Sequence, residues 1–348
     1  MFRKVAILVL PALLFLIGGG FESAFGQFDQ IYQRKGAPSK GNVKAMSKDE
    51  VVLEMSGVDR PFATNEIVRI TYVDEPTELN NGRNAVLQQN WGQAEIELKK
   101  LDGQTFARDL IRQDVEYYKA LCLAKKAMTE GGDKTAAAAA MLNFAKVAPE
   151  NYHFYDAAEV LGDLAISTSK YADAARFYGG IEKAPWGDYQ MRAKNAAGRA
   201  LLAQKDFQNA QVKFEEAVAI DLGTAEAARE KTFAHIGRAQ CLAELGTPEE
   251  GITILQDIIA KNDPADQFLF ARVYNALGNC YLKGNKPKDA RDAFLFTDIL
   301  FTADPDAHAE ALYHLSKLWT DLNKADRAVA ARNTLRERYA GSRWNTVE

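Results

Sequence analysis

The sequence has few of the residues that mark metal, redox or disulfide-rich proteins, with three cysteines and four histidines among 348 residues. The odd number of cysteines excludes a scaffold held by fully paired disulfides. We expect Cys122, Cys241 and Cys280 to pack as small apolar side chains, with a disulfide between Cys241 and Cys280 as the alternative. The net charge of -4 and the lack of a basic tract give no indication of nucleic-acid binding.

Catalytic and cofactor motifs are also missing. The segment GAPSKGN at residues 36–42 has the glycine spacing of a phosphate-binding loop but lacks its Lys and Ser/Thr, so we expect a surface turn. No GxSxG or HExxH motif occurs, and the carboxylates show no spacing that suits acid–base catalysis. Glu310 and His314 share a helix face, where weak metal binding and ordinary packing are both open. We therefore predict a protein that is not an enzyme and needs no metal or cofactor.

The only long apolar run lies at the amino terminus. Arg3 and Lys4 precede an apolar stretch over residues 5–17, and small residues follow up to Gly26. This order is typical of a secretory signal peptide, and the run is shorter than the ~20 residues of a membrane span. We expect a signal peptide over residues 1–26, cleaved near Gly26, and a periplasmic or otherwise exported protein. A retained signal anchor is the alternative. No later segment is long and apolar enough to span a membrane.

Short alternating segments fill residues 27–74. Apolar and polar residues alternate over residues 51–55 and 67–71, and turn-forming residues separate the runs. So short a segment predicts a small all-β domain, either an SH3-like barrel or a curled sheet, which rests on the region that follows.

From residue 75 onward, helical periodicity replaces the strands, and small residues recur at a fixed spacing. Glycine inside a helix costs about 1 kcal/mol relative to alanine, so Gly278 on an apolar face indicates close contact with another helix. Ala290 follows at twelve positions. The same spacing relates Gly82 to Ala94, Gly162 to Ala174, Gly198 to Ala210, Ala239 to Gly251 and Ser316 to Ala328, with a looser copy near residues 121–144. A period of roughly 36 to 43 residues predicts stacked helix pairs.

The segment VYNALGNCYLKGNKPKDARDAF resembles the tetratricopeptide repeat (TPR). Gly278, Tyr281 and Ala290 occupy places where that family has small, large and small residues, whereas Thr297 and Arg332 depart from its pattern. The resemblance implies a right-handed TPR α-solenoid over residues 75–348, with about seven helix-turn-helix repeats starting near residues 75, 118, 155, 191, 232, 271 and 309. The ending RYAGSRW is similar to the endings of exported bacterial members. The whole arrangement resembles cell-envelope TPR proteins, including Tol–Pal-associated and envelope assembly proteins.

The resemblance also implies a binding groove on the first helix of each repeat. Carried over by register, the groove residues are Arg192, Asn195, Arg199, Arg272, Asn275, Asn279, Lys283, Tyr313 and Lys317, while the fifth repeat offers Phe233, Ile236 and Gln240. Asn and basic side chains are typical of sites that hold a peptide's terminal carboxylate, with a merely solvated face as the alternative. We predict a non-catalytic exported scaffold that binds a protein or peptide in this groove. Binding of peptidoglycan or another envelope polymer by the β domain is the alternative function.

Overall fold

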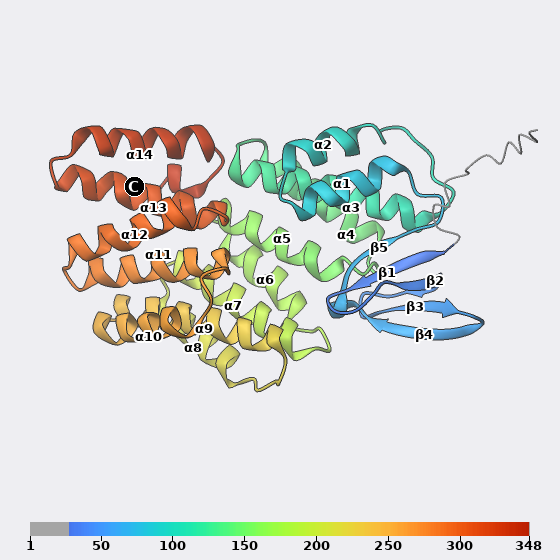
Figure 1. The fold of residues 1–348 in the computed structure, drawn as a ribbon, viewed down its shortest axis with the longest axis horizontal. Coiled ribbons are helices and arrows are strands. Elements are labelled where there is room, and N and C mark those ends of the chain that lie inside the picture. Colours follow the sequence, from blue (N-terminus) through green and yellow to red (C-terminus); the bar gives the residue numbers. More distant parts are fainter. Residues whose placement is uncertain (1–27, 348) are drawn as a thin grey trace, which may run out of the picture.

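The computed structural model describes residues 28–347, in which a small β domain precedes fourteen helices (Figure 1). The signal peptide predicted for residues 1–26 lies outside the described residues. The strands are β1 (Asp29–Gln33), β2 (Ser39–Met46), β3 (Glu50–Met55), β4 (Val58–Ala63) and β5 (Ile67–Thr71), with a 3-10 turn at Thr64–Glu66. The predicted combination of a small β domain and a helical solenoid is confirmed.

The helices follow one another in pairs. They are α1 (Thr77–Leu87), α2 (Trp91–Lys99), α3 (Asp109–Thr129), α4 (Lys134–Val147), α5 (Phe154–Ser167), α6 (Tyr171–Ile181), α7 (Gly187–Ala203), α8 (Phe207–Ala219), α9 (Ala225–Glu244), α10 (Pro248–Lys261), α11 (Gln267–Lys283), α12 (Pro287–Leu300), α13 (Pro305–Asp321) and α14 (Ala325–Arg338). Odd-numbered helices are the first helices of the repeats and even-numbered helices the second. Among the described residues, no helix combines the length and apolar character that a membrane span requires.

The five strands form an antiparallel sheet in the order β4-β3-β2-β1-β5. β2 pairs with β1 over residues 39–41 and with β3 over residues 42–46, where the register shifts between Val43 and Ala45. At Gly41 a Cβ atom would lie 2.2 Å from the main-chain oxygen of Glu54. Ile31, Leu53 and Ile70 are fully buried in the centre of this domain. Of the turn predicted at residues 36–42, only residues 36–38 lie between the strands, because residues 39–42 already belong to β2.

The recurring glycines stand where the two helices of a repeat cross. A Cβ atom on Gly278 would lie 2.7 Å from the ring of Phe294, and one on Gly162 would lie 2.2 Å from the ring of Tyr178. Gly198 faces Phe214 in the same way, and Gly82 faces Leu98. In every case, the large residue is four positions after the second small residue of the spacing. The first helix therefore lacks a side chain so that the second helix can insert a large one.

The turn inside several repeats needs one residue in the left-handed region. Asn285 has a φ of 54° between α11 and α12, in the stretch that the sequence predicts as a tight turn. The equivalent residues are Gln89 (φ 55°), Ser169 (φ 57°), Lys205 (φ 64°) and Asn323 (φ 54°). Prolines at the start of α10, α12 and α13 favour the helical φ and need no hydrogen-bond partner there.

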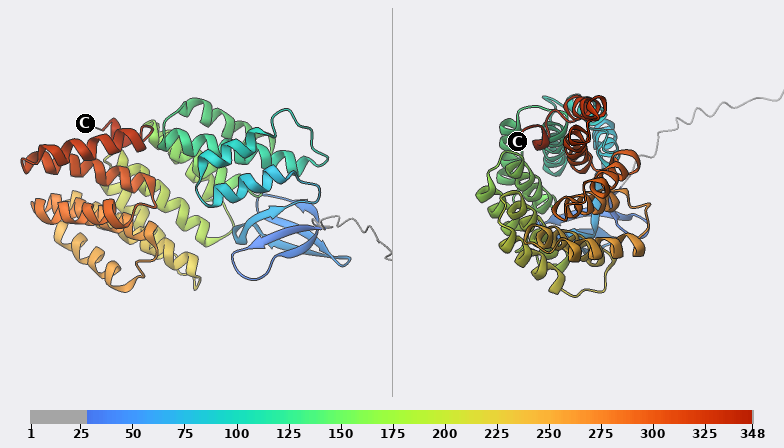
Figure 2. Two further views of the ribbon diagram at one scale, coloured as in Figure 1. Left: turned by 45° about the horizontal axis from the view of Figure 1, so that its top comes forward. Right: turned by 90° about the vertical axis from the view of Figure 1, so that its left-hand side faces the viewer.

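The helix pairs wind round until the carboxy-terminal end returns to the turn between α3 and α4 (Figure 1 and Figure 2). The main-chain N–H of Gly341 donates to the oxygen of Thr129 at 2.9 Å. A Cβ atom on Gly341 would lie 2.3 Å from the oxygen of Ala127, so only glycine fits at this contact. The segment RYAGSRW thus joins the last repeat to the second one.

A buried set of ion pairs fixes the β domain on the first repeats. The guanidinium of Arg83 on α1 donates to Glu75 and to Asp114 of α3, both at 2.7 Å, and Arg83 and Asp114 are fully buried. Arg108, just before α3, makes a two-pronged contact with Asp29 of β1 at 2.6 and 3.0 Å. Buried charges of this kind are tolerated only when they are paired, so the domain and the solenoid hold a defined relative position.

Candidate binding surface on the first helices

The predicted groove residues, called here the first-helix strip, are the nine residues Arg192, Asn195, Arg199, Arg272, Asn275, Asn279, Lys283, Tyr313 and Lys317. They lie on α7, α11 and α13. Most of them contact the first helix of a neighbouring repeat, which the sequence does not reveal. Arg192 of α7 contacts two carboxylates of α5, Asp156 at 3.0 Å and Glu159.

Two asparagines of the first-helix strip make the same contact in two different repeats. Asn195 donates to the main-chain oxygen of Glu230 at 2.9 Å and to its carboxylate at 2.8 Å. Asn275 donates to the main-chain oxygen of Ala307 at 2.7 Å and to the carboxylate of Glu310 at 2.9 Å. In both repeats the acceptor carboxylate is 35 residues further along the chain. That spacing of Asn and Glu is a sequence signal that the register analysis missed.

Other basic residues of the first-helix strip are also paired. Arg272 donates from Nε to Asp304 at 2.7 Å, and its guanidinium lies 5.3 Å from the ring centre of Phe233. The ammonium of Lys283 lies 2.6 Å from the carboxylate of Glu244 on α9. Asn279 donates to Glu310 at 2.9 Å. These contacts join α9, α11 and α13, so the side chains hold successive repeats in register as well as lining a surface.

Arg199 differs from the other arginines of the first-helix strip. Among the described residues it forms no ion pair within 4.0 Å, yet Glu159 and Asp163 of α5 lie within electrostatic reach of it. Lys317 is exposed, and its ammonium lies 4.4 Å from the ring centre of Tyr313. Arg199 and Lys317 are therefore the two cations of the strip that no carboxylate within residues 28–347 holds at ion-pair distance.

The carboxylates of this surface have pKa values that report a partly desolvated environment. Burial raises the pKa of Asp163 and, despite hydrogen bonds from Asn279 and Asn275, that of Glu310. Burial acts in the same direction on Glu159, but the ion pair with Arg192 outweighs it and the pKa is lowered.

Electrostatic interactions also connect repeats that are distant in sequence. The pKa of Arg272 on α11 is raised chiefly by Asp304 and to a smaller extent by Asp163 on α5. Helices α5 and α11 are the first helices of the third and sixth repeats. The winding of the solenoid therefore turns first helices three repeats apart toward one another.

The described residues show no cluster of three or more His, Cys, Asp or Glu side chains suited to a metal ion. The ring of His314 stacks on Phe294 at 4.6 Å, and burial lowers its pKa to about 4. Glu310, its neighbour on α13, accepts from Asn275 and Asn279. All three cysteines are free and buried, so the structure contains no disulfide between Cys241 and Cys280.

Comparison with known proteins gives a fold and no family assignment. No family model matches the chain, and no curated protein matches it. A tetratricopeptide repeat protein from Parabacteroides merdae superposes with a TM-score of 0.51 at 14% identity, covering 75% of this chain and 91% of the other. A Rap protein solved in complex with competence and sporulation factor gives a TM-score of 0.51 at 14% identity, covering 77% and 76%. At these identities the likeness establishes the fold alone, a TPR-type α-solenoid.

Proposed function

We propose that the protein is a non-catalytic scaffold that binds an extended protein or peptide segment along the first-helix strip. The observation that carries the proposal is the guanidinium of Arg199 on α7, which no carboxylate of the described residues holds at ion-pair distance, together with the partly exposed Asn279 of α11 and the exposed Lys317 of α13. Asn195 and Asn275 are buried and donate between repeats, so they position this surface and do not contact a partner. Amide groups suit a peptide main chain and guanidinium groups suit a carboxylate. The complex of the similarly folded Rap protein supports the idea that such a solenoid accommodates a partner.

Arg199 is the residue we expect to bind a carboxylate of the partner directly. A partner carboxylate at Arg192 has to compete with Asp156 and Glu159, whereas the guanidinium of Arg199 has no ion pair at contact distance in the described part of the chain. Hydrogen bonds to charged groups contribute about 1.5–3 kcal/mol, so one such contact is measurable in a binding assay. A terminal carboxylate is the simplest ligand that satisfies this geometry.

We further propose that the protein is exported and that residues 1–26 are removed. We place the boundary between the β domain and the solenoid near residue 74. The support is the charged, apolar and small-residue order of the amino terminus. Cell fractionation and amino-terminal sequencing test this directly. A protein that retains Met1 in the cytoplasm contradicts it.

The alternative function, binding of an envelope polymer by the β domain, has no specific observation in its favour. The ring of Tyr72 is buried, with the guanidiniums of Arg83 and Arg108 within 6 Å of it. Tyr32 is covered by Arg69, whose guanidinium lies 4.2 Å from the ring centre. These aromatic side chains serve the packing of the domain, so we do not adopt the alternative.

Fluorescence anisotropy with two pools of random dye-labelled peptides tests the scaffold proposal. One pool has free carboxyl termini and the other is amidated. We expect the free-carboxylate pool to bind the wild-type protein and to bind Arg199→Glu at least about tenfold more weakly. Arg176→Glu is the matched control, because Arg176 is 70% exposed on the second helix α6. Equal binding of both pools, or no effect of Arg199→Glu, contradicts the proposed role of Arg199.

A further inference from the structure

The first-helix strip contacts six carboxylates of neighbouring repeats, and two of them have no cation beside them within the described part of the chain. The paired ones are Asp156 and Glu159 with Arg192, Asp304 with Arg272, and Glu244 with Lys283. The other two are Glu230 of α9 and Glu310 of α13. They accept hydrogen bonds from neutral amides instead, those of Asn195, Asn275 and Asn279.

The environment of these two carboxylates makes their charge costly. Glu230 and Glu310 are half-buried, so water solvates the charge only in part. Burial raises the pKa of Glu310 despite its two amide donors. A hydrogen bond from a neutral amide offsets less of this cost than an ion pair does. Each of the two repeats therefore keeps a negative charge that is compensated incompletely.

A second observation at both places points in the same direction. The side-chain oxygens of Asn195 and Asn275 are buried and accept no hydrogen bond from the described residues. Both residues are only 1% exposed. Each amide nitrogen donates to its carboxylate at 2.8 or 2.9 Å, so the amide oxygen lies within about 5 Å of that carboxylate. Buried acceptors without a donor are rare, and here each one adds its negative dipole end to a nearby carboxylate.

The two carboxylates and Arg199 follow one another along the solenoid. Arg199 is on α7, Glu230 on α9 and Glu310 on α13. Successive first helices contact one another in the order α7, α9, α11 and α13. A segment that runs along the strip from Arg199 therefore meets Glu230 first and Glu310 second. If its terminal carboxylate lies at Arg199, the residues that meet Glu230 and Glu310 are on the amino-terminal side of that end.

We propose that Glu230 and Glu310 are two subsites for basic side chains, so that the first-helix strip binds a segment with two lysine or arginine residues upstream of its terminal carboxylate. An ammonium or guanidinium group at each carboxylate makes a charge-assisted hydrogen bond and offsets the negative charge that the neutral amides leave. Asn195 and Asn275 stay behind the carboxylates and fix their position. This inference rests on the proposed function, because it names the chemistry of a partner that binds along the same strip.

Fluorescence anisotropy with two pools of dye-labelled nonapeptides tests the proposal on the full chain. Both pools have free carboxyl termini and contain Gly, Ala, Ser, Thr and Val at random. One pool has two lysines in each peptide, and the other has two glutamines at the same positions. We expect the lysine pool to bind the wild-type protein at least about tenfold more tightly. Glu230→Gln and Glu310→Gln should each weaken its binding at least about threefold, and the double variant at least about tenfold.

The glutamine pool shows whether the variants leave the strip intact. A glutamine side chain keeps an acceptor oxygen for the asparagines, so the contacts between first helices are retained. Binding of the glutamine pool should therefore be the same for Glu230→Gln, for Glu310→Gln and for the wild type. Glu250→Gln is the matched control, because Glu250 is exposed on the second helix α10, and it should bind both pools as the wild type does.

Arg199→Gln separates this inference from the proposed function. It removes the guanidinium without adding a charge, so it should weaken both pools by the same factor. If both pools bind the wild type equally and Arg199→Gln weakens both, the subsites for basic side chains are wrong and the proposed function stands. Equal binding of the lysine pool by the wild type and the double variant also overturns the inference. If neither pool binds up to about 1 mM, the inference and the proposed function are both wrong.

Discussion

Replacing Gly162 with alanine tests the packing logic of the repeats. In an open helix this change stabilises by up to about 1 kcal/mol, because alanine has the higher helix propensity. Here the new Cβ atom would lie 2.2 Å from Cε1 and 2.5 Å from Cζ of Tyr178. Overpacking of a core costs about 1–3 kcal/mol. Tyr178 is fully buried and its hydroxyl donates to Asp163 at 2.9 Å, so the ring has little freedom to move.

We therefore expect Gly162→Ala to lower the free energy of unfolding by about 2 kcal/mol, from the upper overpacking cost less the propensity gain. Gly179→Ala is the matched control on α6, because a Cβ atom there meets nothing within 4 Å. That variant should be neutral or more stable by up to about 1 kcal/mol. Urea unfolding followed by circular dichroism measures both, and an unchanged m-value confirms that the same transition is compared.

A double-mutant cycle locates the cause of the loss. Tyr178→Leu removes the Cε1 and Cζ atoms that the new methyl group meets, and it imitates the first repeat, where Gly82 faces Leu98. The penalty of Gly162→Ala should be at least about 1 kcal/mol smaller in the Tyr178→Leu background. If Gly162→Ala stabilises the protein as Gly179→Ala does, close helix contact is not the reason for the glycine, and the packing argument is wrong.

Three further predictions concern the contact between Gly341 and Thr129, acid stability and the thiols. Gly341→Val should break the contact with Thr129, which should raise the rate of hydrogen exchange in residues 129–132 and the radius of gyration. Unchanged values would contradict the view that Gly341 holds the last repeat against the second one. Burial lowers the pKa of His153 well below 6.5, so stability is fully present above pH 6.5 and falls by up to about 1.4 kcal/mol per pH unit below it. His153→Phe should flatten this slope in urea titrations. Burial raises the pKa of Cys241 and of Cys280 to about 12, so Ellman's reagent should react with these thiols only after unfolding.

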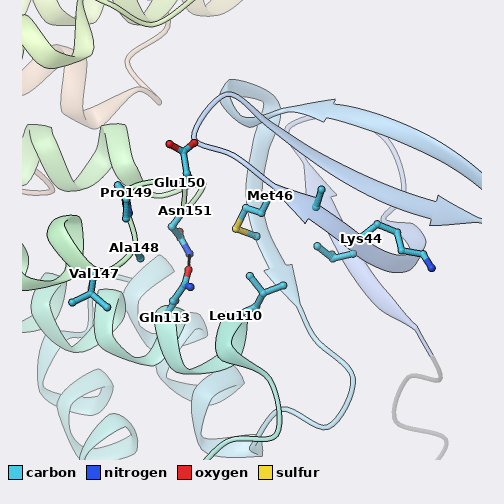
Figure 3. A pocket seen from close by; sticks show the side chains of 11 residues that line it. Lys44, Met46, Leu110, Gln113, Val147, Ala148, Pro149, Glu150 and Asn151 are labelled. Atoms are coloured by element: carbon cyan, nitrogen blue, oxygen red, sulfur yellow. Dashed lines mark hydrogen bonds between the residues drawn. The ribbon is translucent and has the colours of Figure 1, made fainter.

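The small-residue spacing predicted the helix pairs and their crossing points because it reflects contact between neighbouring segments of one repeat. Gly278 and Ala290 indicate a crossing without knowledge of any other repeat, and the structure places Phe294 there. Helix ends are less well defined by that pattern. The second repeat was predicted to start near residue 118, whereas α3 begins at Asp109. The additional residues include Leu110 and Gln113, which line a cavity together with residues 43–46 of β2 (Figure 3), a contact that a repeat register does not contain.

The ion-pair partners of the first-helix strip were not predictable from the repeat register alone. The register correctly located basic and amide side chains on first helices, but not their partners. Arg192, Arg272 and Lys283 each meet a carboxylate from another repeat. Such pairs depend on the distance between helices that are about 35 residues apart in sequence, which is set by stacking. Their role in binding a partner stays a prediction.

Site-specific photo-crosslinking tests the central claim, binding along the first helices, most directly. A photoreactive residue is placed at Gln240 on the first helix α9 or, as the control, at Arg176 on the second helix α6, and a peptide that binds in the anisotropy assay is added. The account predicts that the peptide crosslinks from position 240 and not from position 176. Crosslinking from position 176 alone, or equally from both, contradicts it.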